Sequence, residues 1–502
     1  MEVLQGKRKY SPWRQITLCV TAALSVITLI YAGSKGNMII PVAVALLPAL
    51  AYIIMITVGE LKNAFLLLFV VNFFIPFVGR YWLNAPIGII MDGMIAYTLL
   101  VLLCHVMSHS IIYSHVRMEP VIATGIWLVY CILEAFNPRT ISAYVWFTHV
   151  RNMGLYMFII IILVQTTFDS FQTVHKLLVV WSLLVLVAVG KALMQKYVGW
   201  DSAEKYFLYV MDGQRTHIIH SGIRYFSIFT DASNFGGNMG MASVVFLLVA
   251  AYTKNLFLKI FYFLTAGLAI YGLLISGTRS ALAVPFAGLA VFVMVCGNPR
   301  TAIPVFLIMI SSFVFLKYTT IGQGNAVIRR ARSVFDQSDE SYQVRQRNQA
   351  RLKELLEPLP FGNSLGMSAG RGKKFGDTSE LADIPTDSWF VQLWVETGRV
   401  GLTLYLGIMI YLLVRGGIII FFSIKNNEVK GVSAAFLSGV SGLFVMSSNN
   451  EVFSQYPNSI MAYTCLGLVF LAPVFDAELE KKKKQKEIAL TENKDGKAKG
   501  KA

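Results

Sequence analysis

The sequence predicts an all-α integral membrane protein of about fourteen transmembrane helices, with two long loops on one side of the membrane. Hydrophobic residues make up 55% of the 502 residues, and the mean hydropathy is +0.59, more than a soluble fold of this length could bury. Apolar runs near the length of a bilayer core recur along the chain. They lack the alternation of barrel strands, and a single strand cannot satisfy its backbone in lipid, so we expect helices.

The apolar runs give the expected spans, which in chain order are 16–33, 38–57, 63–78, 87–107, 119–136, 148–166, 174–194, 239–253, 257–275, 280–296, 301–318, 399–422, 431–448 and 457–475. The first run has no small-residue cleavage site and is followed at once by the second. We therefore expect it to be retained as a span rather than removed as a signal peptide.

Positive charge sets the expected orientation. It gathers at the N-terminus, in the turns after the tenth and twelfth spans, and after the last span, at Lys7, Arg8, Lys9, Arg14, Arg300, Lys425, Lys430, Lys481, Lys482, Lys483 and Lys484. An even number of spans puts all of these on one side, which the positive-inside rule makes cytoplasmic. Both termini are then cytoplasmic, and segments 195–238 and 319–398 lie on the outer face.

This orientation divides the chain into helices 1–194, a first outer loop 195–238, helices 239–318, a large outer loop 319–398, helices 399–475 and a tail 476–502. The tail is rich in Lys and Glu, a composition that predicts disorder. The large loop should contain an amphipathic helix near 342–357, ended by Pro358 and Pro360. Loops on a rigid scaffold are where binding and catalysis tend to lie.

Charge, cysteines and motifs exclude several classes. The net charge of +16 lies largely in short loops and the tail, as topology signals and anionic lipid contacts would, and does not indicate nucleic acid. The five cysteines show neither a zinc spacing nor a disulfide framework. There is no convincing Walker loop, dinucleotide fingerprint, zinc signature or Gly-x-Ser-x-Gly elbow. We therefore expect no cofactor and no metal.

Two motifs surround the span at 239–253 and the one that follows it. The turn Ser276-Gly277-Thr278-Arg279 combines a tight turn, hydroxyls and a guanidinium, which suits an anion, although Arg279 could equally contact lipid headgroups. The stretch from Arg224 to Asn234 mixes aromatics with Arg224 and Asp231, as a sugar or pyrophosphate site would. Just upstream lie Arg215, His217 and His220; the two histidines, three residues apart, could share a helix face as metal ligands but lack a clear third ligand.

Two further motifs lie in the large loop. Asp387, just before the span at 399–422, is either a helix N-cap or a general base near the membrane surface. Trp389 either binds substrate or belongs to an aromatic belt. Arg345 and Arg347 head the expected loop helix and are followed by a Pro-Phe-Gly stretch; they could line a site or simply form a solvated face.

In this order, the motifs resemble the O-antigen ligase and O-antigen polymerase family of bacterial envelope glycan assembly, over about residues 215–402. The resemblance implies a GT-C-like membrane glycosyltransferase of the inner membrane, which takes a glycan from an undecaprenyl-pyrophosphate carrier on the periplasmic side. The acceptor would be lipid A-core for a ligase or another carrier-linked glycan for a polymerase. By the same resemblance, Arg224 and Arg279 would contact the carrier pyrophosphate.

One departure from the family pattern concerns the base. The ligase pattern has His-Asn where this chain has Asp387-Ser388, and segment 319–398 contains no histidine. Asp387 could replace that histidine as the base, or His217 or His220 could act from the first loop. The departure favours a polymerase or a ligase of divergent mechanism.

Two other classes remain open from the sequence. One is a flippase for lipid-linked oligosaccharides, which should carry charges along its mid-membrane helices; here the span interiors are nearly free of charge, with Lys191 as the main exception. The other is an envelope scaffold whose arginines only bind headgroups. Neither the glycan nor the oligomeric state follows from the sequence.

Overall fold

A computed structural model describes residues 47–82, 87–108, 115–219, 222–333 and 340–499. Contacts divide the chain into two compact units. Unit 1 comprises residues 1–68 and 93–111, and unit 2 comprises residues 69–92 and 112–502. The candidate site and the residues that support it lie in unit 2.

The described residues are almost entirely helical, as predicted. The first half holds α3 (Leu47–Gly59), α4 (Leu61–Tyr81), α5 (Ile87–Met107), α6 (Met118–Leu133), α7 (Ala143–Val150), α8 (Tyr156–Thr167), α9 (Phe171–Tyr197), α10 (Ser202–Tyr209) and α11 (Gln214–His217). After it come α12 (Ala232–Tyr252), α13 (Leu256–Ile275), α14 (Ala283–Val295), α15 (Pro299–Tyr318), α16 (Ala326–Arg332), α17 (Glu340–Leu356), α18 (Ala369–Lys374), α19 (Trp389–Ile418), α20 (Asn427–Met446) and α21 (Asn458–Lys499). Within the described ranges the only strands are β1 (Ile218–Ile219) and β2 (Gly222–Ile223), an antiparallel pair.

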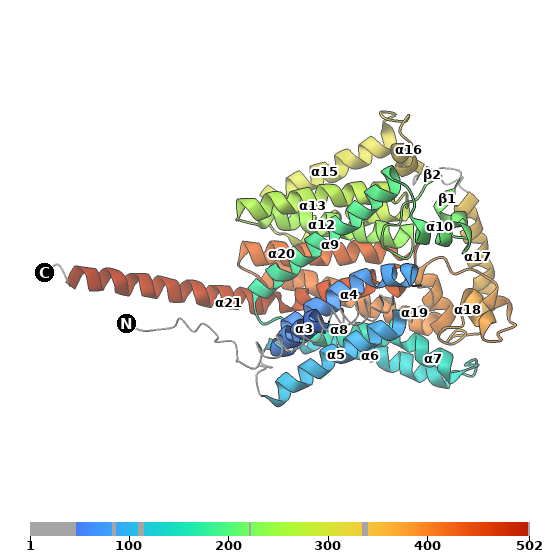
Figure 1. Ribbon diagram of the computed structural model, residues 1–502, viewed down its shortest axis with the longest axis horizontal. Helices are drawn as coiled ribbons and strands as arrows, with labels where there is room; N and C mark the ends of the chain where they lie inside the picture. Colours follow the sequence, from blue (N-terminus) through green and yellow to red (C-terminus); the bar gives the residue numbers. More distant parts are fainter. Residues whose placement is uncertain (1–46, 83–86, 109–114, 220–221, 334–339, 500–502) are drawn as a thin grey trace, which may run out of the picture. The chain divides into compact units, whose positions relative to one another are not determined.

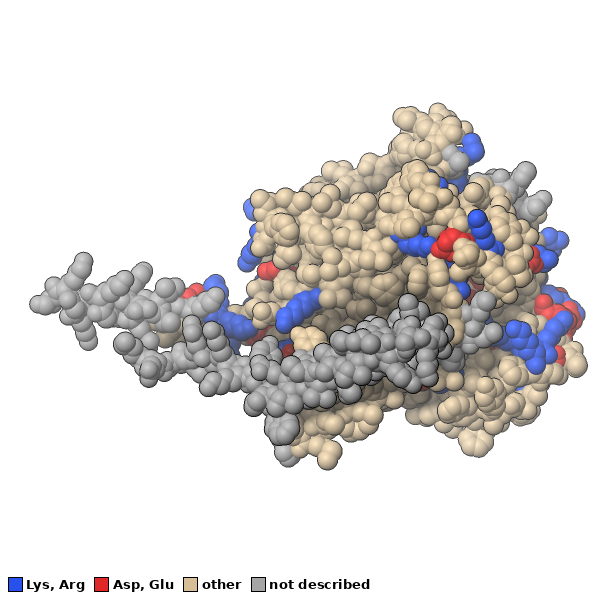
Figure 2. Space-filling view, in the orientation of Figure 1, with Lys and Arg blue, Asp and Glu red and all other residues tan. Residues whose placement is uncertain are grey.

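Eleven helices of the described part are long and apolar enough to cross a membrane, which confirms an all-α, multi-pass membrane protein. Two shorter apolar helices, 50–59 and 280–295, coincide with expected spans. The first expected span, 16–33, lies outside the described residues, so the count of fourteen stays a prediction. Figure 2 shows charged side chains gathered toward the ends of the helices, with a largely uncharged surface between them.

The centre of unit 2 is a closely packed group formed by α12, α14, α20 and α21. Small residues let their backbones approach, as is common between membrane helices. A Cβ atom added to Gly442 of α20 would lie 2.4 Å from the carbonyl oxygen of Val284 in α14. A Cβ atom at Gly288 of α14 would lie 2.8 Å from the carbonyl oxygen of Ser438 in α20. This contact fixes where α14 begins, and with it the turn that precedes it.

Two spans begin earlier than hydropathy predicts. Helix α12 starts at Ala232 rather than 239, because the Asp231 side chain caps it by accepting hydrogen bonds from the backbone N–H groups of Ser233 and Asn234. The polar first turns of α12 lower its local hydropathy, but they are satisfied by distant partners such as Asn458, which donates to the Asn234 side chain at 2.5 Å. Helix α19 starts at Trp389 rather than 399 because Ser388 caps it.

The expected loop helix at 342–357 is present as α17, which ends before Pro358. The tail differs from expectation, since α21 continues to Lys499 through a region expected to be disordered. Ion pairs between residues four apart, Glu478 with Lys482 and Glu480 with Lys484, stabilise a helix there.

The connecting segments gather at one end of unit 2. Figure 1 shows α10, β1, β2, α16, α17 and α18 at the same end, away from the C-terminal part of α21. We call this the loop end of unit 2. The two segments that the sequence predicts to be long loops, 195–238 and 319–398, therefore come together in space.

Candidate functional site

A cavity of about 470 Å³ lies at the loop end of unit 2. Three segments that are distant in sequence form its walls, and its lining residues are Thr216, His217, Arg224, Asp231, Ala232, Ser233, Asn234, Ala369, Arg371, Pro385, Thr386, Asp387, Asn450, Glu451, Val452 and Gln455. The cavity thus brings together Arg224 and Asp387, two residues that the sequence singled out from separate loops. It also includes a third segment, 450–455, that the sequence analysis did not single out.

Arg224 lies on one wall, held by neutral acceptors. Its Nη1 donates to the carbonyl oxygen of Thr216 at 3.1 Å. Its Nη2 donates to the hydroxyls of Ser233 at 3.1 Å and Thr278 at 2.8 Å. Among the described residues, its buried Nε has no hydrogen-bond partner. A guanidinium fixed in this way, with donor capacity left over, is suited to bind an anion.

The Ser276-Gly277-Thr278-Arg279 turn supports Arg224 from behind. The hydroxyl of Thr278 accepts from Arg224 and donates to the carbonyl oxygen of Ala232 at 3.0 Å, so it links the turn to the start of α12. Ser276 is buried, and its hydroxyl donates to the carbonyl oxygen of Leu273 at 2.7 Å. Ser276 and Thr278 therefore shape the turn, and neither lines the cavity.

Arg330 of α16, which the sequence analysis missed, packs on this turn. Its Nε donates to the carbonyl oxygen of Gly277 at 2.5 Å. Gly277 has φ +59°, and a Cβ atom there would lie 3.0 Å from that Nε, so the turn depends on glycine. Arg279 and Arg330 line a narrow crevice beside the main cavity. Arg279 is thus a neighbour of Arg224 rather than part of the same wall.

Four arginines influence one another here, and we call Arg224, Arg279, Arg330 and Arg345 the arginine cluster. Burial lowers the pKa of Arg224, Asp231 partly offsets this, and the positive charges of Arg279 and Arg345 lower the pKa further. Burial lowers the pKa of Arg330 to about 10, and the charges of Arg224 and Arg279 add to the effect. Like charges held together in this way favour a bound anion.

Arg371 of the large loop lines the cavity, whereas three other arginines of the two loops lie elsewhere. Arg215 is exposed and paired with Asp212 at 2.6 Å, so the structure does not bring it to the cavity. Arg347 is exposed on α17 and does not line the cavity either. Arg351 pairs with Glu380 at 2.7 Å on the surface. Of the α17 arginines, Arg345 is the one whose charge reaches Arg224.

His217 lines the cavity, but both of its ring nitrogens are engaged. Nδ1 lies 2.9 Å from the carbonyl oxygen of Gly213, and Nε2 accepts from the backbone N–H of Ala232 at 3.3 Å. These partners require the neutral ring with its proton on Nδ1. Burial lowers the pKa of His217, which agrees with a neutral ring. His220 lies outside the described residues.

Asp231 and Asn234 build the start of α12. Asp231 lines the cavity, and one of its carboxylate oxygens is used for capping. Asn234 is buried, and its side-chain amide donates to the carbonyl oxygen of Tyr456 at 2.6 Å. The side chain of Asn234 therefore fastens α12 to the segment before α21.

Asp387 lies on the wall that the large loop contributes, and it is exposed. It has φ +50°, a left-handed conformation that aspartate tolerates better than most residues. Ser388, rather than Asp387, caps α19, because its hydroxyl accepts from the backbone N–H of Val391 at 3.1 Å. Trp389 is buried in the helix bundle with its ring centroid 5.9 Å from that of Tyr405, so it does not face the cavity.

The third segment adds Glu451 to the same wall as Asp387. Glu451 accepts a hydrogen bond from the Thr386 hydroxyl at 2.6 Å, and its other oxygen lies 3.5 Å from Arg371. Burial raises the pKa of Glu451; Arg371 and Thr386 partly offset this, and the charges of Glu396 and Asp387 add to it. The signal in the sequence was the polar run Asn449-Asn450-Glu451 between two expected spans.

Glu396 anchors the large loop from inside α19. Its fully buried carboxylate accepts from the backbone N–H of Gly366 at 2.9 Å, from the Ser368 hydroxyl and from the Gln392 amide at 3.1 Å. Two residues later, Gly398 breaks the helix with φ 66°. The carbonyl oxygen of Pro360 fills the break by accepting from the N–H of Val400 at 3.2 Å. The Pro-Phe-Gly stretch is thus part of the scaffold.

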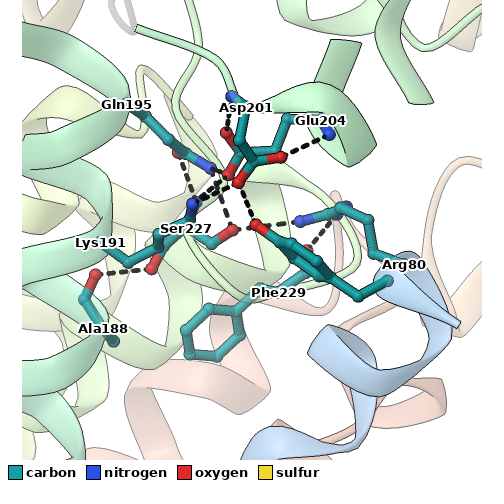
Figure 3. Close-up of polar contacts among 9 residues, drawn as sticks. Arg80, Ala188, Lys191, Gln195, Asp201, Glu204, Ser227 and Phe229 are labelled. Atoms are coloured by element: carbon teal, nitrogen blue, oxygen red, sulfur yellow. Dashed lines mark hydrogen bonds and ion pairs between the residues drawn. The ribbon is translucent and has the colours of Figure 1, made fainter. Parts of the chain in front are cut away.

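A polar network holds the first loop from the other side (Figure 3). Lys191 of α9 pairs with Asp201 at 2.7 Å and with Glu204 at 2.9 Å. Arg80 of α4 donates to three carbonyl oxygens of the loop backbone, those of residues 227, 229 and 230, at 3.1, 2.5 and 3.0 Å. Its guanidinium also lies 4.2 Å from the ring centroid of Phe226. The charge of Lys191 is therefore satisfied by this network.

These features define a multi-pass membrane protein whose helix ends carry a polar cavity beside an arginine cluster. The sequence profile of the O-antigen ligase family matches residues 261–406, from within α13 to just past the middle of α19, and so confirms the family resemblance drawn from the motifs. The match contains Arg279 and Asp387 but ends before Glu451. No curated protein and no solved structure matches the chain.

Proposed function

We propose that the chain transfers a glycan from an undecaprenyl-pyrophosphate carrier to a saccharide acceptor at the periplasmic face of the bacterial inner membrane. The observation that carries the proposal is the cavity that Arg224 of the first loop lines together with Asp387 of the large loop and Glu451. Guanidinium groups bind the oxygens of a pyrophosphate, and a carboxylate can take a proton from a sugar hydroxyl. Arg224 would thus bind the leaving group, and Asp387 or Glu451 would take the proton of the nucleophile.

An apolar cavity supports a lipid donor. It has a volume of about 500 Å³, and its lining comes from α12, α13, α14, α15 and α16. Leu273, Leu274, Leu282 and Ala331 belong both to this cavity and to the crevice of Arg279 and Arg330. A polyprenyl tail in the apolar cavity would therefore place its pyrophosphate at the arginine cluster.

In the proposed reaction, the acceptor hydroxyl attacks the anomeric carbon and the lipid pyrophosphate departs. The arginine cluster stabilises the negative charge that develops on the departing pyrophosphate, as donors in an oxyanion hole do. The polar wall offers two carboxylates for the proton, Asp387, which the sequence analysis favoured, and Glu451. The family match does not favour the flippase alternative.

The test is complementation of a deletion strain with single variants. We expect Arg224→Ala and Arg279→Ala each to reduce the transfer rate by about 10²–10³-fold, because each removes a group that stabilises the negative charge on the departing pyrophosphate. Arg215→Ala is the matched control, since Arg215 is exposed and paired with Asp212. Full glycan transfer by Arg224→Ala would refute the site.

The same strain separates the two acceptors. Loss of a polymerase should leave lipid A-core carrying a single repeat. Loss of a ligase should instead leave long polymer attached to the carrier. The glycan profile of the deletion strain therefore decides between a polymerase and a ligase.

A further inference from the structure

The turn between α20 and α21 touches both sides of the cavity. The side-chain amide of Asn450 donates to the hydroxyl of Ser280, the residue that follows Arg279. The next residue, Glu451, accepts from Thr386 on the large loop. Two adjacent side chains therefore tie the arginine side of the site to the carboxylate side, and they fix where the Glu451 carboxylate lies between them.

Of the three carboxylates that line the cavity, Asp231 caps α12, and the other two, Glu451 and Asp387, differ in how they are held. Glu451 is 24% exposed and is oriented by Thr386 at 2.6 Å, with Arg371 at 3.5 Å. Asp387 is exposed to solvent on the rim. A group that takes a proton in the transition state must be held in place within reach of that proton. This requirement favours Glu451 over Asp387.

We infer that Glu451 is the proton acceptor for the attacking hydroxyl, and that Asp387 acts only through its charge. This inference rests on the proposed glycan transfer. The hydroxyl oxygen of the acceptor forms a bond to the anomeric carbon of the donor sugar, and the bond from that carbon to the pyrophosphate oxygen breaks. The bonding electron pair leaves with the lipid pyrophosphate, the proton moves to a carboxylate oxygen of Glu451, and solvent later removes it.

The surroundings of Glu451 make it a stronger base than an ordinary glutamate. Burial raises its pKa first of all, and the negative charges of Glu396 and Asp387 raise it further. Arg371 and the Thr386 hydroxyl lower the pKa without cancelling these effects. Since general bases work best when their pKa lies closer to the working pH, the raised value suits this role.

His217 is a poorer choice for the same role. Its Nε2, the nitrogen that would accept a proton, already accepts from the backbone N–H of Ala232 at 3.3 Å. Taking a proton there would break a contact at the start of α12. It would also add a positive charge near Arg224 and Arg80, both of which lower the pKa of His217.

The experiment measures transfer by the full-length protein in membrane vesicles. The donor is the carrier-linked glycan extracted from membranes of the deletion strain. The rate and the KM for this donor are measured across pH for the wild type, Glu451→Gln, Glu451→Asp and Asp387→Asn. The matched control is Glu354→Gln, which changes an exposed carboxylate of α17 in the same way.

We expect Glu451→Gln to reduce kcat by about 10²–10⁴-fold with little change in the KM for the donor. The wild-type rate should fall at low pH as Glu451 becomes protonated. The pH at the midpoint of this fall, which we call the acid limb of the pH profile, should lie above the usual pKa range of a glutamate. The limb should disappear in the residual activity of Glu451→Gln and shift in Glu451→Asp, which should recover part of the rate. Glu354→Gln should match the wild type, and Asp387→Asn should keep most of the rate and move the acid limb downward.

Two results would overturn the assignment. In the first, Glu451→Gln keeps the wild-type rate and acid limb. In the second, Asp387→Asn abolishes the limb while Glu451→Asp recovers no activity. If the wild type itself does not consume the carrier-linked glycan, the proposed function fails, and the role of Glu451 fails with it.

Discussion

Replacing Gly277 by alanine tests the turn on which the arginine cluster is built. Gly277 has φ +59°, and a Cβ atom there would lie 3.0 Å from Nε and 3.2 Å from Cζ of Arg330. The substitution thus adds backbone strain and pushes the Arg330 guanidinium. The substitution removes none of the four arginines of the cluster.

The expected magnitude follows from these two contributions. An alanine in the left-handed region costs about 1–2 kcal/mol. The guanidinium of Arg330 must also move by a few tenths of an ångström, which weakens its hydrogen bond to the carbonyl oxygen of Gly277 at 2.5 Å. A hydrogen bond to a charged group contributes about 1.5–3 kcal/mol, of which part is lost. We therefore expect a loss of about 2 kcal/mol or more in the free energy of unfolding.

The assay compares thermal unfolding and glycan transfer of Gly277→Ala with those of Gly267→Ala. Gly267 lies in the middle of α13, and a Cβ atom there would meet nothing within 4 Å. Alanine at that position should leave stability unchanged or raise it by up to about 1 kcal/mol. Gly277→Ala should unfold earlier and transfer up to about 10²-fold more slowly, because its arginines are misplaced. Equal unfolding and equal transfer by the two variants would refute this account of the turn.

Three other perturbations test the scaffold. Arg80→Lys should reduce transfer by up to about 10²-fold without lowering protein level, because a compact ammonium cannot span the three carbonyl groups as the guanidinium fork does; unchanged transfer would contradict this positioning role. Glu396→Gln should cost about 1–3 kcal/mol and expose the large loop to proteases, since an amide nitrogen replaces a buried acceptor; unchanged protease resistance would contradict it. For Asp201, burial opposes ionisation, but hydrogen bonds from Lys191 and Tyr81 outweigh it and lower the pKa to about 2. Its stabilising contribution should be present above pH 3.8 and lost as the pH falls toward 2. The temperature at the unfolding midpoint should therefore change less with pH over that range in Asp201→Asn than in the wild type.

The fold class follows from the sequence because hydropathy is a property of local runs, whereas helix ends depend on distant partners. Asn234 and Asn238 make the start of α12 too polar to be recognised as a span. In the structure both side chains contact Asn458, which lies more than two hundred residues later. The α19 start was missed for a related reason, since its first turns hold buried polar residues such as Gln392 and Glu396.

The site could be predicted only where a loop is long enough to attract attention. Arg224 and Asp387 come from the two long loops, and the structure places both on one cavity. Glu451 lies in a short turn between two spans, and contacts with residues distant in sequence, Asn450 with Ser280 and Glu451 with Thr386, bring that turn to the site. Residue type alone also could not separate cavity walls from scaffold, so Trp389 was expected at the site although it is buried.

The arginine cluster makes few contacts with acidic residues: Asp231 acts on Arg224 through its charge, whereas Glu451 pairs with Arg371 outside the cluster. The recorded side-chain hydrogen bonds of Arg224 go to neutral oxygens, and that of Arg330 goes to the carbonyl oxygen of Gly277. Within the described residues, Arg224 Nε and Arg330 Nη1 are buried without a partner. A carboxylate inserted between these groups would neutralise the cluster and compete with a phosphate for the same donors. Because Glu451 is held by Thr386 and Arg371 rather than by the cluster, the cluster keeps its affinity for an anion. Of the arginines, Arg371 lowers the pKa of Glu451, and burial outweighs that effect.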